Sequence, residues 1–63
     1  MILNNNQLAK LRRPVHITYI QNYILKLTEE QTRDVINYNV DEGIIEESKY
    51  GKDYYVLKNN SND

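Results

Sequence analysis

The hydrophobic positions of this chain follow a helical spacing over most of its length and a strand-like pattern near its end. Leu8 and Leu11 lie three residues apart within the segment 7–13. Pro14 cannot continue a helix, because its ring clashes with the preceding turn and it has no N–H to donate. We therefore predict a first helix over 7–13, capped by one of the asparagines before it, and then a short strand over 15–17.

A second helix is predicted from an apolar stripe with the spacing i, i+3, i+4 and i+7. The residues of this stripe are Ile20, Tyr23, Ile24 and Leu27. Thr18 and Gln21 have the spacing of a capping box, so Thr18 is expected to open the helix. Tyr23 is expected in the core, and His16 is read as a structural strand residue.

A third helix is predicted over 28–42, directly after a turn at 25–27. Thr28 and Gln31 form a second capping box, and Glu29 and Glu30 in the first turn suit the helix dipole. The apolar stripe of this helix is Val35, Ile36 and Val40. Gly43 suits the left-handed position that ends a helix.

A β-hairpin is predicted over 44–57, because two runs rich in β-branched and aromatic residues flank a short polar loop. Gly51 is expected to supply the bend. Tyr54 and Tyr55 point to opposite faces of a strand, so one of them should be exposed. Tyr19, Tyr38 and Tyr50 are expected at the surface.

The order helix, short strand, helix, tight turn, helix, glycine and hairpin resembles the winged-helix family of helix-turn-helix domains. The resemblance covers about residues 7–58 and rests on the segments 17–24, 28–42, 43–46 and 54–57. It implies an α+β fold, a small winged helix-turn-helix with three helices and a C-terminal β-hairpin wing. The single domain would span 1–58, followed by a polar tail over 59–63 that is expected to be disordered. Asn39 departs from the family, which usually has a large aliphatic residue there, so it must find hydrogen-bond partners or turn toward solvent.

Composition argues against several classes of function. The 63 residues include no cysteine and one histidine, so no disulfide and no metal site is expected. No glycine-rich phosphate loop or nucleophile motif supports an enzyme or a cofactor. No apolar run approaches the roughly 20 residues of a membrane span, and no signal peptide is visible, so we expect a cytoplasmic protein without a membrane partner. A core this small favours dimerisation as a source of further burial, so a homodimer is a candidate.

The winged-helix resemblance implies binding of double-stranded DNA, as a small transcriptional regulator whose third helix enters the major groove. Arg33 suits guanine, and Gln31 and Asn37 suit adenine. The hairpin tip would contact phosphates through lysines. The full set of candidate DNA-binding residues is Arg12, Arg13, Gln31, Arg33, Asn37, Tyr38, Lys49, Tyr50 and Lys52.

The distribution of charge keeps an alternative open. The net charge is −1, but residues 1–28 carry no acid, while 29–48 carry acids with Arg33 as their only basic residue. Glu29 can pair with Arg33 four residues on, whereas Glu30 and Asp34 repel each other and would repel phosphate. The acids are either helix caps or the surface of a winged-helix protein–protein interaction module that uses its third helix.

Overall fold

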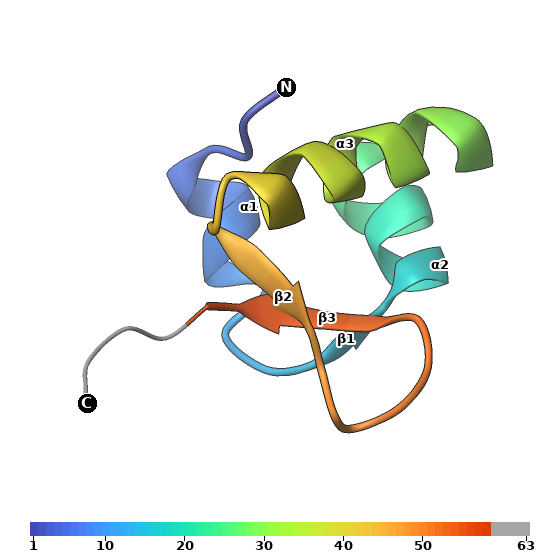
Figure 1. The fold of residues 1–63 in the computed structure, drawn as a ribbon. Coiled ribbons are helices and arrows are strands. Elements are labelled where there is room, and N and C mark those ends of the chain that lie inside the picture. The colour runs from blue at the N-terminus through green and yellow to red at the C-terminus, as the bar shows by residue number, and fades with distance from the viewer. Residues whose placement is uncertain (59–63) are drawn as a thin grey trace.

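Three helical segments lie on one side of a small antiparallel sheet (Figure 1). The computed structural model describes residues 1–58, and the predicted tail over 59–63 lies outside the described residues. The elements in chain order are α1 (Asn5–Ala9), β1 (Val15–His16), α2 (Ile17–Tyr19), the π-helix η1 (Ile20–Leu25), α3 (Glu29–Asp41), β2 (Ile45–Glu47) and β3 (Tyr54–Leu57). The predicted α+β class is confirmed at this level.

The first helix is shorter than predicted. Asn4 caps α1: its Oδ1 accepts from the Gln7 N–H at 2.8 Å, and the Gln7 Oε1 accepts from the Asn4 N–H at 2.9 Å. The helix ends at Ala9, well before Pro14. Leu11 is fully buried and its carbonyl accepts from the Leu57 N–H at 2.7 Å, so the chain leaves the helix to reach the core and the sheet.

The second helical segment begins and winds differently from the prediction. His16, at the end of β1, is the N-cap, and its Nδ1 accepts from the Thr18 N–H at 3.2 Å; the predicted cap at Thr18 is wrong. α2 runs directly into η1, whose turns close over five residues rather than four. The predicted 3.6-residue spacing therefore fails along η1. Ile20 and Ile24 are buried, but Tyr23 is 64% exposed, so its predicted place in the core is wrong.

The third helix agrees closely with the prediction. Lys26 ends η1 with a left-handed φ of 58°. The capping box at Thr28 is confirmed, with both bonds to Gln31 at 3.1 Å. At the other end, Gly43 has φ 75°, and the N–H groups of residues 43 and 44 donate back to carbonyls 40 and 39 at 3.0 and 2.9 Å. This is the Schellman arrangement that ends a helix at a left-handed residue.

The hairpin joins a sheet with the strand order β1-β3-β2. Gly51 lies at a bend of the loop between β2 and β3, as predicted, and the left-handed residue of this loop is Asp53, with φ 64°. A Cβ at Gly51 would stand 3.0 Å from Cδ1 of Tyr54, so a side chain there would require the Tyr54 ring to shift by a few tenths of an ångström. Tyr54 and Tyr55 are both half-buried, so neither is the exposed tyrosine that strand alternation predicts.

The core lies between the helices and the inner face of the sheet. Its buried hydrophobic side chains are Leu3, Leu11, Ile17, Ile20, Ile24, Val35, Ile36 and Ile45. The prediction for Val40 is wrong, since it is 37% exposed near the end of α3. Asn39 is fully buried and forms hydrogen bonds, which is the first of the two predicted alternatives.

Candidate functional site

The exposed side of α3 carries the polar side chains on which the functional prediction depends. An open hollow along this side is lined by Thr28, Glu29, Glu30, Arg33, Asp34 and Asn37. Arg33 and Asn37 are four residues apart and share this hollow. Gln31 is exposed, but its Oε1 is bonded to the Thr28 N–H in the capping box. Tyr38 is 42% exposed and does not line the hollow.

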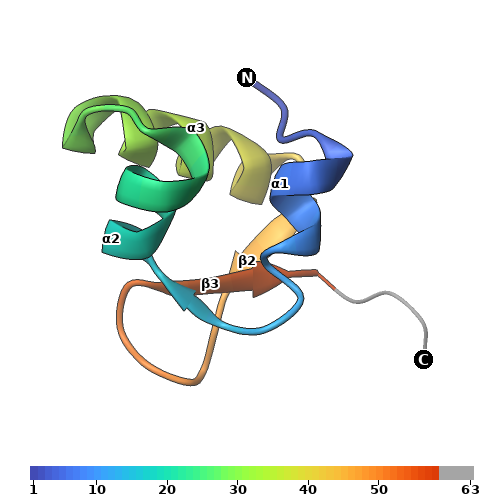
Figure 2. The ribbon, with the colours of Figure 1, turned by 180° about the vertical axis from the view of Figure 1, so that it is seen from behind.

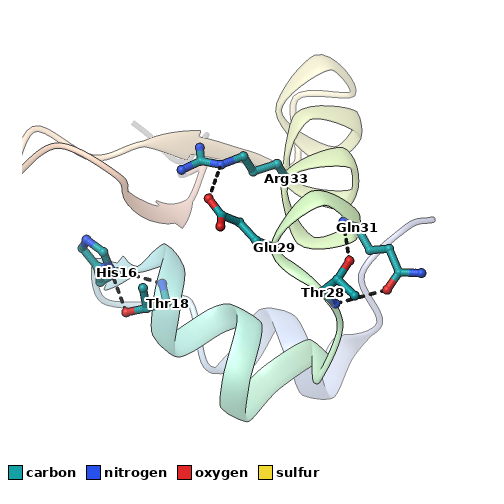
Figure 3. Close-up of polar contacts among 6 residues, drawn as sticks. All are labelled: His16, Thr18, Thr28, Glu29, Gln31 and Arg33. Atoms are coloured by element: carbon teal, nitrogen blue, oxygen red, sulfur yellow. Dashed lines mark hydrogen bonds and ion pairs between the residues drawn. The ribbon is translucent and has the colours of Figure 1, made fainter.

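Arg33 is the basic residue of this hollow, and it is paired. Its Nε lies 3.5 Å from Oε2 of Glu29, one turn earlier, as the sequence spacing predicts (Figure 3). The two side chains are 46% and 72% exposed, so solvent screens the pair, and its contribution to stability is about 0.3–0.5 kcal/mol. A pair this weak leaves the guanidinium free to exchange Glu29 for another acceptor.

Tyr55 reports the electrostatics of the space between α3 and the hairpin. Burial raises the pKa of its hydroxyl above the ordinary value of 10.0, and the carboxylates of Glu47 and Asp53 raise this pKa further, while Arg33 lowers it. The charge of Arg33 therefore reaches Tyr55 on β3, where it opposes the charges of two hairpin carboxylates.

The tip of the hairpin carries the other predicted basic residues. Lys49, Tyr50 and Lys52 are all exposed, and Tyr50 is 73% exposed. The Ser48 Oγ accepts from the Tyr50 N–H at 2.9 Å, which fixes the turn. The ring of Tyr50 lies 4.8 Å from that of Tyr54. The tip thus presents two exposed lysines, close in sequence to a tyrosine whose ring packs on Tyr54.

Arg12 and Arg13 do not join this group. They lie in the loop between α1 and β1, and β1 is the edge strand opposite β2. α3 contacts β2, at the other edge of the sheet. Arg12 instead lines a hollow with Asn5, Leu8, Ala9 and Leu57. The predicted basic residues are therefore divided between two sides of the molecule, which segment-by-segment reading of the sequence could not reveal.

The structure also contains contacts between aromatic side chains that were not predicted from the sequence. The ring of His16 lies 5.0 Å from that of Tyr54, and the rings of Tyr19 and Tyr23 are also 5.0 Å apart. The pairing of His16 with Tyr54 depends on the register of β1 against β3. Only the exposed Tyr19 had been predicted as a surface residue. Since register between distant strands leaves no local signal in one sequence, this contact could not be predicted.

The described part of the chain has neither a metal-binding cluster nor a membrane-spanning helix. Within residues 1–58, no set of three or more His, Cys, Asp or Glu side chains is arranged to hold a metal ion. No helix of this part is long and apolar enough to cross a membrane. Comparisons with protein-family models, with curated proteins and with solved structures gave no match.

Proposed function

We propose that this protein is a winged-helix domain that binds double-stranded DNA, with α3 in the major groove and the hairpin over 44–57 as the wing. The arrangement of α3 and the hairpin carries the proposal. α3 has 13 residues, is capped at its start, and leaves Arg33 and Asn37 exposed in one hollow. It contacts β2, the first strand of the hairpin whose tip carries two exposed lysines. In such an arrangement the helix in the groove contacts base edges and gives specificity, while the basic tip contacts the DNA backbone and gives affinity.

Each side chain has a role that matches its chemistry. Arg33 would donate two hydrogen bonds to guanine and Asn37 would pair with adenine, while Gln31 and Tyr38 lie at the margin of the contact. Lys49 and Lys52 would bind phosphates, with Tyr50 between them. Arg12 and Arg13, at the other edge of the sheet, fit the proposal only as contacts to more distant phosphates. No catalytic step, cofactor or metal is needed.

The biological role that fits this proposal is a small cytoplasmic transcriptional regulator. A homodimer would present two α3 helices to two half-sites, as helix-turn-helix proteins commonly do. It would also add buried surface to a chain of 63 residues.

Duplex binding is tested with a labelled random-sequence duplex and fluorescence anisotropy at low salt. We expect measurable affinity that falls steeply with salt, because phosphate contacts release counterions. Lys52→Ala should weaken binding to all sequences and lower the salt slope by about one. Arg33→Ala should weaken binding to a selected site by about 1–3 kcal/mol and relax its specificity. Lys58→Ala, an exposed lysine outside the hairpin tip, is the matched control. An absence of duplex binding at low salt would rule the proposal out.

The acids favour a second candidate, a protein–protein interaction module that binds a basic partner through α3. Glu29, Glu30 and Asp34 line the same hollow as Arg33, and the carboxylates of Glu47 and Asp53 act with Arg33 on Tyr55 of the hairpin. A carboxylate repels phosphate unless it is paired, whereas it attracts a basic protein surface and speeds association.

Charge reversal separates the two candidates. The double variant Glu30→Lys and Asp34→Lys should tighten duplex binding if α3 enters DNA, because two repulsive charges become attractive. The same variant should abolish binding of a basic partner if α3 is a protein interface. Recovery of a stoichiometric protein partner by the wild type, lost in this variant, would favour the second candidate.

A further inference from the structure

A row of aromatic rings runs across the side of the molecule formed by η1, β1 and the hairpin. Tyr23 and Tyr19 lie 5.0 Å apart with their planes tilted by 38°. His16 meets Tyr54 at 5.0 Å, and Tyr54 meets Tyr50 at 4.8 Å, both edge to face. Figure 2 shows η1, β1 and the hairpin loop together on this side, seen from behind. The rings form two groups, Tyr23 with Tyr19 and His16 with Tyr54 and Tyr50, and their residues come from three separate segments.

A shallow hollow joins the two halves of the row. It is lined by Lys10, Pro14, Val15, His16 and Tyr19. Its lining contains a lysine and no carboxylate, and all of it comes from residues 1–28, where the sequence has no acid. At the far end, Tyr50 stands between Lys49 and Lys52 at the exposed tip. Glu46, opposite Val56 in the register, is the acid that shares the outer face of the sheet with Tyr54.

Much of this aromatic surface is open to solvent. Tyr19 is 48% exposed, Tyr23 is 64% exposed and Tyr50 is 73% exposed, whereas His16 and Tyr54 are half-buried. Tyr50 meets Tyr54 edge to face, and such rings do not cover both of each other's faces. At the other end Tyr19 and Tyr23 are tilted against each other but largely exposed, so both ends of the row offer ring surface to another flat molecule.

We infer that this aromatic row is a binding site for single-stranded nucleic acid, which shares the hairpin tip with the proposed duplex site but does not include α3. Unpaired bases stack on tyrosine irrespective of sequence, and lysines along the path neutralise the phosphates between them. A duplex cannot use the row, because its bases are already stacked and paired. The charge pattern also favours a nucleic acid here: the hollow of the row is lined by Lys10 and no carboxylate, whereas three carboxylates line the hollow along α3.

The test is an anisotropy titration of the full chain with a labelled oligothymidylate of about 15 nucleotides, near the upper site size of a small single-strand-binding domain. The double variant Tyr19→Ala and Tyr23→Ala should weaken binding by at least about fivefold, the lower limit for one lost stack. Tyr19→Phe with Tyr23→Phe keeps the rings and should bind as the wild type does. Lys10→Ala should weaken binding and lower its salt slope by about one.

The matched control is Tyr38→Ala, since Tyr38 is a similarly exposed tyrosine on α3, outside the row. It should leave oligothymidylate binding unchanged. Circular dichroism of each variant confirms that the exposed substitutions leave the fold intact. Arg33→Ala should also leave single-strand binding unchanged, so that loss of duplex binding and loss of single-strand binding are separate results.

Three outcomes would overturn the inference. The wild type does not bind oligothymidylate at low salt, or the Tyr38 control weakens binding as much as the row variant does. The third outcome is that the Tyr19→Ala and Tyr23→Ala double variant keeps its oligothymidylate affinity, while sedimentation velocity shows that the double substitution dissociates a dimer. The row would then be an interface between two copies of the chain.

Discussion

Asn39 offers a direct test of how this small domain holds its N-terminal segment. Its side chain is fully buried and makes three hydrogen bonds: Oδ1 accepts from the Leu3 N–H at 3.1 Å, and Nδ2 donates to the carbonyls of Met1 and Val35 at 2.9 and 2.7 Å. Leu3 is itself buried in the core. Asn39 therefore fastens the first residues of the chain to the last turns of α3.

Replacement of Asn39 by alanine should cost about 3 kcal/mol. The three bonds contribute about 0.5–1.5 kcal/mol each, and a Leu3 N–H left buried without a partner adds a penalty of about 1–3 kcal/mol unless the segment detaches. A chain of 63 residues has a total stability of roughly 3–9 kcal/mol, so the loss is a large fraction of the whole. Urea denaturation followed by circular dichroism measures it.

Asn37→Ala is the matched control. Asn37 is exposed on the same helix, so both substitutions gain the same helix propensity and only one loses buried hydrogen bonds. A deletion of residues 1–3 should reduce the cost of Asn39→Ala, because the two changes remove the same contacts. Equal effects of the two alanine substitutions, or full additivity with the deletion, would refute this account.

Three other predictions concern the fold. Thr32 is fully buried and its Oγ1 has no hydrogen-bond partner among the described residues, so Thr32→Val should stabilise the protein by about 1 kcal/mol in the same assay; a destabilised valine variant would mean that the hydroxyl is bonded. Gly43→Ala should destabilise the protein by about 1–2 kcal/mol, because the backbone at Gly43 has φ 75°, although nothing would contact the added Cβ. An unchanged free energy of unfolding would contradict this backbone strain. Burial raises the pKa of the Tyr55 hydroxyl in the folded protein, and the carboxylates of Glu47 and Asp53 raise it further. The contribution of this hydroxyl to stability is therefore complete below the unfolded-state pKa near 10.0 and is lost as pH rises through the higher folded-state pKa. Tyrosinate absorbance should show a late-titrating tyrosine that Tyr55→Phe removes; loss of an early step instead would contradict the shift.

The parts of the fold set by local chemistry were the most predictable. The Thr28 capping box, the stop at Gly43 and the ion pair between Glu29 and Arg33 each depend on residues within a few positions of one another, and all three are confirmed. The fold class followed from the order of such elements.

The errors arose where distant packing overrides a local pattern. Tyr23 fits a 3.6-residue stripe, but the π-helical winding of η1 turns it outward. The first helix stops early because Leu11 is needed in the core and beside β3. In the hairpin loop, Gly51 lies at a bend as predicted, but the left-handed conformation falls on Asp53, which the sequence does not single out.

The candidate site was predictable as a set of exposed residues but not as an arrangement. Every predicted DNA-binding residue is exposed. Their division between the side of α3 and the opposite edge of the sheet, where Arg12 and Arg13 lie, depends on the strand order β1-β3-β2. The contact between His16 and Tyr54 depends on the same topology.

Mapping of amide chemical shifts during a titration with duplex DNA tests the proposed function most directly. We predict that the largest changes fall along the exposed side of α3, at Arg33 and Asn37, and at the hairpin tip from Lys49 to Lys52. The amides of Tyr19 and Tyr23 should change little with duplex and should respond to oligothymidylate instead. Duplex-induced changes confined to η1 and β1, or no changes at low salt, would contradict the assignment of α3 as the DNA-reading helix.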